Sequence, residues 1–378
     1  MKILYLSHTD IRSDSRILKS IQAAIDSGYD VSAIGIAANE GTINAENGIT
    51  SLITTLELYT RRWTLLPKFL RHVFSLIELT FKALRLAIYY KPDLIHCNDT
   101  IALPLCVFLK MHLKNTRLIY DAHELESNRN GLSRPLGLLT FYCEKILWHY
   151  VDSFITVSPS IQTWYLNHFS YRPSTVVLNA PVYKKIDSNN FNYLRKQYKI
   201  PNEHKIFIYI GIIAEGRGID LLLDVFSTTN IKASIIFLGY GNFAKKIEIA
   251  SSNFKNIYYH TAVSHDRVVE IASSADYGFC LIENVSLSDY YSLPNKLFEY
   301  LFAGLPVIAS NFPDIKNLIY SCNAGLCTDL DVKSILNTVN QIVESNQTFE
   351  IDMHTLSQYD WGSQKYKLLT LYSNTLAN

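Results

Sequence analysis

Residues 293–310 constrain the fold of this chain more than any other stretch, because a helix and a buried strand follow each other there directly. Pro294 suits the first turn of a helix, where it costs no internal hydrogen bond, and Ser292 is a plausible N-cap. Gly304 is expected to end the helix. The apolar run 307–309 that follows is typical of a strand in a parallel sheet. This stretch therefore predicts an α/β fold.

The same alternation of strand and helix recurs along the chain and predicts two Rossmann-like domains. A chain of 378 residues is long for one core and suits two domains of ordinary size. Polar residues gather at 180–200, where we expect the linker. We predict a domain over 1–180, a second over 181–355 and a final helical segment over 356–378. The predicted strands of the first half are 2–7, 31–36, one within 92–99, 117–120 and 154–157. Those of the second half are 206–210, 235–238, 257–259, 277–281 and 307–309.

Composition excludes several classes of protein. A net charge of +1 argues against a general nucleic-acid binder, which carries a marked basic excess. The six Cys are scattered without a CxxC pair, so we expect no zinc site and reduced thiols in a cytosolic protein. The N-terminus lacks the apolar region of a signal peptide, and no apolar run approaches the ~20 residues that a membrane span needs.

The predicted helix of the 293–310 stretch carries groups that suit a nucleotide ligand. Asn295 and Glu299 are four residues apart, so they share one face near the start of the helix. Free backbone N–H groups and the positive end of the helix dipole suit an anion such as a diphosphate. A carboxylate beside them suits sugar hydroxyls. The alternative is a surface helix that contains a Glu without a function.

The motif Pro-Asn-Lys-x-Phe-Glu-Tyr, followed by Gly-x-Pro-Val-Ile, resembles the donor-site helix of family 4 retaining glycosyltransferases. The resemblance extends from the first strand to Trp361 and implies the GT-B fold. In that fold two Rossmann-like doubly wound domains face each other across a cleft, and a C-terminal helix crosses back to the first. The resemblance also implies that Glu299 binds the ribose of a nucleotide sugar. Tyr291 stands where most relatives have another Glu.

Two glycine-rich turns in the second half complete the expected donor site. Residues 211–218 follow a predicted strand and lead into a helix, where backbone amides and Arg217 could hold phosphate. Residues 239–241 resemble the family's Gly-x-Gly turn near the nucleotide. Ile212 stands where relatives have an Arg, and Lys296 is expected to compensate. The predicted donor-binding residues are Gly211, Gly218, Gly239, Gly241, Ser292, Asn295, Lys296, Leu297 and Glu299.

Polar residues also follow the predicted strands of the first half. His123 comes after strand 117–120 and is flanked by carboxylates, which makes it a better site candidate than a lone His. In related enzymes a His at this place contacts the transferred sugar. The resemblance puts Asp14, Arg16 and Asp99 on the acceptor side, whereas a solvated ion pair is the alternative for Asp14 and Arg16. The predicted catalytic residues are His123, Arg217 and Glu299.

Residues 59–91 are basic and rich in aromatic and aliphatic side chains, with Glu78 as the one acid beside seven Lys and Arg. Such a stretch can lie in a membrane interface and bind anionic headgroups, so we predict peripheral membrane contact through residues 59–74. A core helix with a basic outer face is the alternative, and residues 76–90 are expected to form one.

The family resemblance implies a retaining glycosyltransferase, and the sequence offers no convincing metal site, so we expect it to be metal-independent. It would move a hexose from a UDP- or GDP-linked sugar to a hydroxyl of a lipid-linked glycan acceptor. Nucleic acid is not expected as a partner. The expected place is the cytoplasmic face of the membrane, and the expected role is cell-surface polysaccharide synthesis. No cofactor is expected beyond the nucleotide sugar, and Asp329-Leu330-Asp331 is interpreted as a helix cap. The alternatives are a nucleotide-sugar epimerase of the same fold and a non-catalytic GT-B partner subunit.

Overall fold

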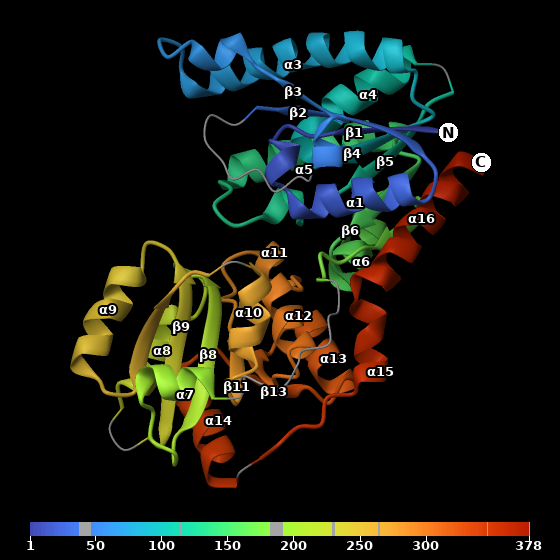
Figure 1. The fold of residues 1–378 in the computed structure, drawn as a ribbon. Helices are drawn as coiled ribbons and strands as arrows, with labels where there is room; N and C mark the ends of the chain where they lie inside the picture. Colours follow the sequence, from blue (N-terminus) through green and yellow to red (C-terminus); the bar gives the residue numbers. More distant parts are fainter. Residues whose placement is uncertain are drawn as a thin grey trace. The chain divides into compact units, whose positions relative to one another are not determined.

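The computed structural model describes residues 1–37, 47–113, 115–181, 192–228, 231–263, 265–345 and 347–377. The chain divides into two compact units (Figure 1). The first consists of Met1–Val177 with Gln364–Asn378, and the second of Leu178–Ser363. Each unit is built on a parallel sheet with helices, which confirms the predicted α/β class with two Rossmann-like domains. Residues 182–191 of the linker predicted at 180–200 lie outside the described residues, and Tyr193–Tyr198 of the same stretch form helix α7.

The sheet of the first unit has the strand order β3-β2-β1-β4-β5-β6-β7 among the described residues. Every neighbouring pair is parallel. The order reverses direction between β1 and β4, and ligands of such sheets bind outside the carboxyl ends of the strands near this point. The strands are β1 Lys2–Leu6, β2 Asp30–Ile36, β3 Ile53–Leu56, β4 Leu94–Asn98, β5 Arg117–Asp121, β6 Ser153–Thr156 and β7 Ser174–Val176.

Helices precede or follow each of these strands. The helix expected at 76–90 is longer than predicted, because it begins at Lys68 and runs without a break to Tyr90. The short α2 covers Asn47–Thr50. The longer helices are α1 Ser15–Asp26, α3 Lys68–Tyr90, α4 Leu103–His112, α5 Arg134–Leu147, α6 Pro159–His168 and α16 Trp361–Ala377.

The last helix, α16, is part of the first unit from Gln364 onward. The hydroxyl of Tyr372 is fully buried and lies 2.8 Å from the hydroxyl of Tyr5 on β1 and 2.6 Å from Nδ1 of His96 on β4. Thr375 forms a second buried link, 2.8 Å from the hydroxyl of Ser153 on β6. Buried polar groups are stable only when they are hydrogen-bonded, so these links fix α16 in one register on the sheet.

The sheet of the second unit has the order β10-β9-β8-β11-β12-β13 and is also parallel. Its core contains the fully buried rings of Phe207, Phe226, Phe237 and Phe279. The strands are β8 Lys205–Ile212, β9 Ala233–Tyr240, β10 Ile257–Thr261, β11 Tyr277–Cys280, β12 Val307–Ser310 and β13 Gly325–Thr328. The helices are α7 Tyr193–Tyr198, α8 Ile219–Phe226, α9 Ala244–Asn253, α10 His265–Ala272, α11 Leu287–Tyr290, α12 Asn295–Phe302, α13 Pro313–Ser321, α14 Val332–Ser345 and α15 Met353–Leu356.

Tyr300 anchors α12 to this sheet. Its buried hydroxyl accepts a hydrogen bond from the N–H of Ile210 on β8 at 2.7 Å and lies 3.2 Å from the carbonyl oxygen of Phe279 on β11. Its ring lies so close to Gly278 that a Cβ there would be 2.8 Å from the ring. The helix ends at Phe302, and Gly304 follows with φ +72°, as the sequence predicts. Helix α12 is therefore anchored through its second turn near the end of β8.

Candidate functional site

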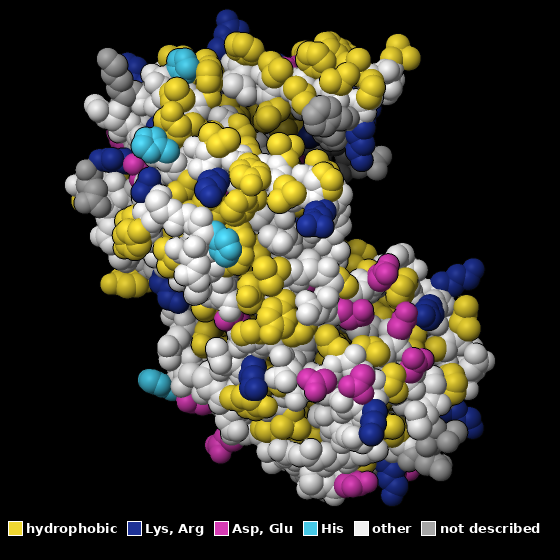
Figure 2. Space-filling view, turned by 180° about the vertical axis from the view of Figure 1, so that it is seen from behind, with side chains coloured by type: hydrophobic (Ala, Val, Ile, Leu, Met, Phe, Trp, Pro, Cys, Tyr) yellow, Lys and Arg dark blue, Asp and Glu magenta, His cyan; other side chains and the backbone are white. Residues whose placement is uncertain are grey.

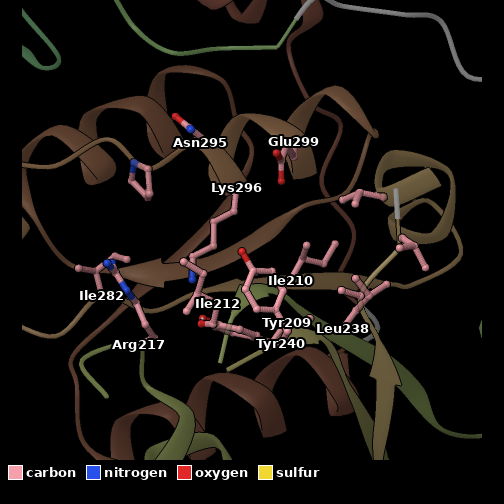
Figure 3. Close-up of a pocket in the computed structure, with 16 residues that line it drawn as sticks. Tyr209, Ile210, Ile212, Arg217, Leu238, Tyr240, Ile282, Asn295, Lys296 and Glu299 are labelled. Atoms are coloured by element: carbon pink, nitrogen blue, oxygen red, sulfur yellow. The ribbon is translucent and has the colours of Figure 1, made fainter. Parts of the chain in front are cut away.

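A pocket of about 530 Å³ opens in the second unit, beside the carboxyl ends of β8 and β9 (Figure 3). The first turn of α12 forms another wall, with Asn295, Lys296 and Glu299. The spacing of four residues thus brings Asn295 and Glu299 to one pocket, as predicted from the sequence. Apolar side chains complete the lining, among them Ile210, Ile212, Leu238, Val263, Val268 and Ile282.

Lys296 places an ammonium group in this pocket. Figure 3 shows its side chain extending from α12 toward Tyr209. The Nζ atom is buried and makes no hydrogen bond in the described structure, and it lies 4.2 Å from the centroid of the Tyr209 ring. The ring face attracts the cation, but a buried ammonium without a hydrogen-bond acceptor is unfavourable. The pocket is therefore suited to an anionic ligand.

Arg217 supplies a second cation at the pocket. Its Nη1 atom lies 4.0 Å from Oδ1 of Asp289, which is longer than a hydrogen bond. Its side chain is partly exposed, so the guanidinium can turn toward a ligand. Ile212, where the family resemblance led us to expect an Arg, also lines the pocket and contributes no charge. Two cations, on the loop before α8 and on α12, can thus balance a diphosphate.

The backbones of β8 and β9 approach each other closely at Gly211 and Gly239, which explains why Gly239 has no side chain. A Cβ at Gly239, where φ is +156°, would lie 1.9 Å from the carbonyl oxygen of Gly211. Both glycines line the pocket, so their backbone is open to a ligand. Gly218 and Gly241 are not among the lining residues. The N–H of Gly218 donates to Oε1 of Glu283 at 3.0 Å and is not open to a phosphate.

Ser292 and Leu297, which were also predicted to bind the donor, lie outside the lining of the pocket. The expected N-cap role of Ser292 is wrong, because Pro294 occupies the cap position and the Ser292 hydroxyl donates to the carbonyl oxygen of Asp289 at 2.8 Å. Helix α11 ends at Tyr290 with Tyr291 as its C-cap, and the Ser292 hydroxyl contacts the last turn of that helix. The side chain of Leu297 is fully buried, and its N–H donates to the carbonyl oxygen of Pro294 at 3.0 Å. Neither residue lines the pocket.

Sequence reasoning missed Tyr209 and Tyr300. Tyr209 lies inside a buried strand, where it reads as an ordinary core residue, yet it is the ring beneath Lys296. Tyr300 sits in the motif itself, and its hydroxyl positions the helix that carries Asn295 and Glu299. The sequence signal that could have identified them is a Tyr within an apolar segment. Because a buried Tyr needs a hydrogen-bond partner for its hydroxyl, such a Tyr indicates a specific contact.

In the first unit, His123 lies at the carboxyl end of β5 between two carboxylates. Its Nδ1 is 3.4 Å from Oδ1 of Asp99, and its Nε2 is 3.5 Å from Oδ2 of Asp121. Nε2 makes no hydrogen bond in the described structure. Burial lowers the pKa of His123, but the carboxylates of Asp99 and Asp121 outweigh it, so the pKa is raised. Asp99 has φ +66°, a strained conformation that often occurs at functional sites.

Arg16 has a structural position that differs from the expected one. It is buried, and its Nη2 and Nε bind the two carboxylate oxygens of Asp121 at 2.7 and 3.2 Å, while Nη1 donates to the carbonyl oxygen of Val177 at 2.6 Å. Asp14 caps α1 by accepting from the N–H groups of Arg16 and Ile17. The two residues therefore do not form the solvated ion pair that was the alternative, because Arg16 pairs with Asp121. Burial raises the pKa of Asp121, but Arg16 and His123 lower it well below the usual range.

Two residues that the sequence did not single out lie close to His123 and Asp99. His8 follows β1, and its buried Nδ1 makes no hydrogen bond in the described structure. Burial lowers the pKa of His8. Glu126 is buried, and burial together with Asp99 raises its pKa well above the usual range. Neutral imidazole and carboxylic acid groups can exchange hydrogen bonds with sugar hydroxyls.

The described residues contain no group of three or more His, Cys, Asp or Glu side chains that could hold a metal ion. The interpretation of the Asp-Leu-Asp triplet as a helix cap is confirmed for Asp331, whose Oδ1 accepts from the N–H of Ser334 at 2.9 Å at the start of α14. Asp329 accepts from the side-chain amide of Asn311 at 3.3 Å.

Among the described residues, no helix has the length and apolar character needed to cross a membrane.

Comparison with known proteins agrees with this division into two units. Residues 17–180 match the model of Glycosyltransferase Family 4, and residues 190–359 match the model of Glycosyl transferases group 1. Chitobiosyldiphosphodolichol beta-mannosyltransferase of Candida albicans is 24% identical over 61% of this chain and 54% of its own length. An uncharacterized glycosyltransferase of Methanocaldococcus jannaschii is 24% identical over 68% of this chain and 64% of its own length. The chain thus spans between about half and two thirds of these relatives.

Solved structures show the same fold at low sequence identity. The Anabaena protein HepE in complex with UDP-glucose has a TM-score of 0.72 and 15% identity, covering 99% of this chain and 100% of its own. Sucrose-phosphate synthase from Thermosynechococcus elongatus has a TM-score of 0.74 and 15% identity, covering 100% of this chain and 99% of its own. With the two domain matches, this similarity places the chain among the glycosyltransferases of the GT-B fold.

Proposed function

We propose that this protein is a retaining hexosyltransferase that uses a UDP- or GDP-linked sugar as donor and a hydroxyl of a lipid-linked glycan as acceptor. The observation that carries the proposal is the pocket of the second unit, where the unpaired ammonium of Lys296 and the carboxylate of Glu299 extend from one helix turn. The cation and Arg217 suit a diphosphate, and Glu299 suits the ribose hydroxyls. The similar fold of HepE, solved with UDP-glucose, supports a nucleotide-sugar donor.

In the proposed reaction the bond between the anomeric carbon and the diphosphate oxygen breaks, and the acceptor oxygen bonds to the same carbon. Lys296 and Arg217 balance the charge that develops on the leaving diphosphate, and a phosphate oxygen of that group takes the acceptor proton. Glu299 orients the donor. It is the one carboxylate among the residues that line the pocket, so a pair of carboxylates for double displacement is not found there.

A lipid-linked acceptor agrees with the name of the Candida relative, which specifies a chitobiosyldiphosphodolichol. The exposed cations of residues 59–74 support contact with an anionic membrane, on its cytoplasmic face, in cell-surface polysaccharide synthesis. The same relative is named as a beta-mannosyltransferase, so the stereochemical course needs a direct test. Proton NMR of the anomeric signal of the product, from a donor of known α configuration, is expected to show an α linkage.

The donor site is tested by calorimetric titration with a panel of UDP-, GDP- and ADP-sugars. At least one is expected to bind the wild type, and Glu299→Ala is expected to weaken that binding by about tenfold or more, since hydrogen bonds to a charged group contribute roughly 1.5–3 kcal/mol. Glu344→Ala on α14 is the matched control. If no nucleotide sugar binds, the non-catalytic alternative holds. If binding leads only to epimerised donor, the enzyme is the epimerase.

A further inference from the structure

The first unit exposes apolar side chains on two helices that the donor site does not use. On α3 the inner face is made of small or buried residues, namely Ser75, Leu79, Ala83 and Ala87. Several large apolar residues point outward, and Phe81 is 64% exposed. The outward stripe follows helical spacing and consists of Phe74, Ile77, Phe81 and Ile88, with Tyr89 beside it. A soluble helix normally has the opposite distribution.

The same pattern occurs on α5. Its outward residues Leu138, Tyr142 and Ile146 are four residues apart and form one stripe, with Leu139 beside it. Ile146 is 71% exposed. Helix α4 packs against both α3 and α5, so the three helices lie next to one another along the same unit (Figure 1). The two stripes therefore belong to one surface, which we call the α3–α5 surface.

Charges on the α3–α5 surface have a single sign. The cations of the three helices that form no ion pair in the described structure are Lys68, Arg71, Arg85, Arg134 and Lys145, whereas Lys82 pairs with Glu78 and Lys110 with Asp152. Their two acids are not available at the surface: Glu144 is fully buried, and Oε1 of Glu78 accepts from Nζ of Lys82 at 2.6 Å. Figure 2 shows yellow and dark blue side chains with few magenta ones over the upper part of the molecule, which is the first unit.

We infer that the α3–α5 surface lies flat on an anionic membrane, so that contact extends well beyond residues 59–74 and includes α5. Exposed aromatic and aliphatic side chains can enter the interface while Lys and Arg reach headgroup phosphates. The aromatic rings of Trp63, Tyr89 and Tyr142 are of the kind that prefers this depth. A protein interface would tend to be depleted in Lys and to offer mixed charges, whereas this surface exposes cations alone. The inference deepens the proposed function, since a membrane surface is where a lipid-linked acceptor is found.

The test is sedimentation with vesicles of phosphatidylglycerol and phosphatidylcholine, compared with vesicles of phosphatidylcholine alone. Tyr142→Ser/Ile146→Ser on α5 and Phe81→Ser/Ile88→Ser on α3 are each expected to lower partitioning by about tenfold or more, because each removes two side chains from the interface. The matched control is Ile249→Ser/Tyr320→Ser, which removes an Ile and a Tyr of similar exposure from the second unit and is expected to change nothing. Arg85→Gln/Lys145→Gln is expected to reduce binding to the anionic vesicles.

Several outcomes would overturn the inference. One is wild-type protein that does not sediment with anionic vesicles, and another is an α5 variant that sediments like the wild type. A third is a wild-type dimer in light scattering that the α5 changes convert to monomer, since the surface would then be an interface between two copies. Nucleotide-sugar titration of the same variants separates this inference from the proposed function: normal donor binding with lost sedimentation supports both, and absent donor binding in the wild type removes the proposed function alone.

Discussion

The Nζ atom of Lys296 is buried over the ring of Tyr209, 4.2 Å from its centroid, and has no hydrogen-bond acceptor in the described structure. A cation in this position is only partly compensated by the ring. An anion in the pocket would supply the missing acceptor. This relationship connects the motif residue Lys296 with a strand residue that the motif does not contain.

Tyr300 is expected to stabilise the second unit and to position α12. Tyr300→Phe removes the acceptor of the buried Ile210 N–H, so the free energy of unfolding should fall by about 1–3 kcal/mol. Urea unfolding measures this change. Tyr320→Phe, an exposed Tyr on α13, is the control and should change stability by no more than about 0.5 kcal/mol. Equal stability of wild type and Tyr300→Phe would contradict the anchoring role.

His123 is expected to contribute to the sugar-transfer step and not to binding of the nucleotide in the pocket of the second unit. His123→Phe should lower kcat by about 100-fold, the effect typical of losing one preorganised polar contact. The dissociation constant for the nucleotide should stay within about threefold, because the pocket of the second unit contains no residue of the first. His168→Phe, an exposed His on α6, is the control. Unchanged kcat in His123→Phe would exclude the role.

The pH dependence of transfer follows from the pKa of His123, which Asp99 and Asp121 raise against the effect of burial. If its cationic form contacts the substrate, kcat should be constant at low pH and fall as pH rises through this raised pKa. Asp99→Asn removes one of the carboxylates, so it should move the fall to lower pH. A pH profile that Asp99→Asn leaves in place would contradict this assignment.

Glu144 should make the stability of the first unit depend on pH. Burial raises its pKa to about 7, although Tyr120, Tyr165 and Thr100 donate to its Oε1 atom. Because the folded pKa is above the unfolded one, its protonated form favours folding at low pH, and this contribution is lost as pH rises through about 7. Between pH 5 and pH 8 the loss should be about 2–3 kcal/mol.

The comparison of wild type with Glu144→Gln isolates this effect from other titrating groups. The amide does not titrate, so the difference in unfolding free energy between the two proteins should shift with pH by about the same 2–3 kcal/mol. Asp224→Asn on α8, in the second unit, provides the control. A difference that stays constant from pH 5 to pH 8 would show that Glu144 has an ordinary pKa in the folded protein.

Much of the fold was predictable from the sequence, because strand and helix periods alternate clearly in both halves. The face shared by Asn295 and Glu299 followed from helix geometry alone. The predictions that failed concern residues whose position depends on other parts of the chain. Arg16 on α1 binds Asp121 at the end of β5, a partner 105 residues further along the chain that local pattern does not indicate. The cap role of Ser292 failed because the chain closes a short helix there first.

The exposure of apolar side chains on α3 could not be predicted from the sequence, because helical spacing does not determine which of two apolar faces points inward. Within residues 76–90 the buried face consists of Leu79, Ala83 and Ala87, whereas the larger Phe81 and Ile88 are exposed, so a rule that buries the larger side chains would choose the wrong face. The small face of Ala83 and Ala87 is buried, which lets the helix lie close to the rest of the unit. Packing, not local pattern, decides such cases.

The most direct test of the central claim is calorimetric titration of wild type and Lys296→Met with the nucleoside diphosphate of the preferred donor and with its nucleoside. The wild type is expected to bind the diphosphate far more tightly than the nucleoside, and Lys296→Met is expected to lose about tenfold or more of this preference. Lys316→Met, an exposed Lys on α13, should keep it. Equal preference for the diphosphate in wild type and Lys296→Met would contradict the account.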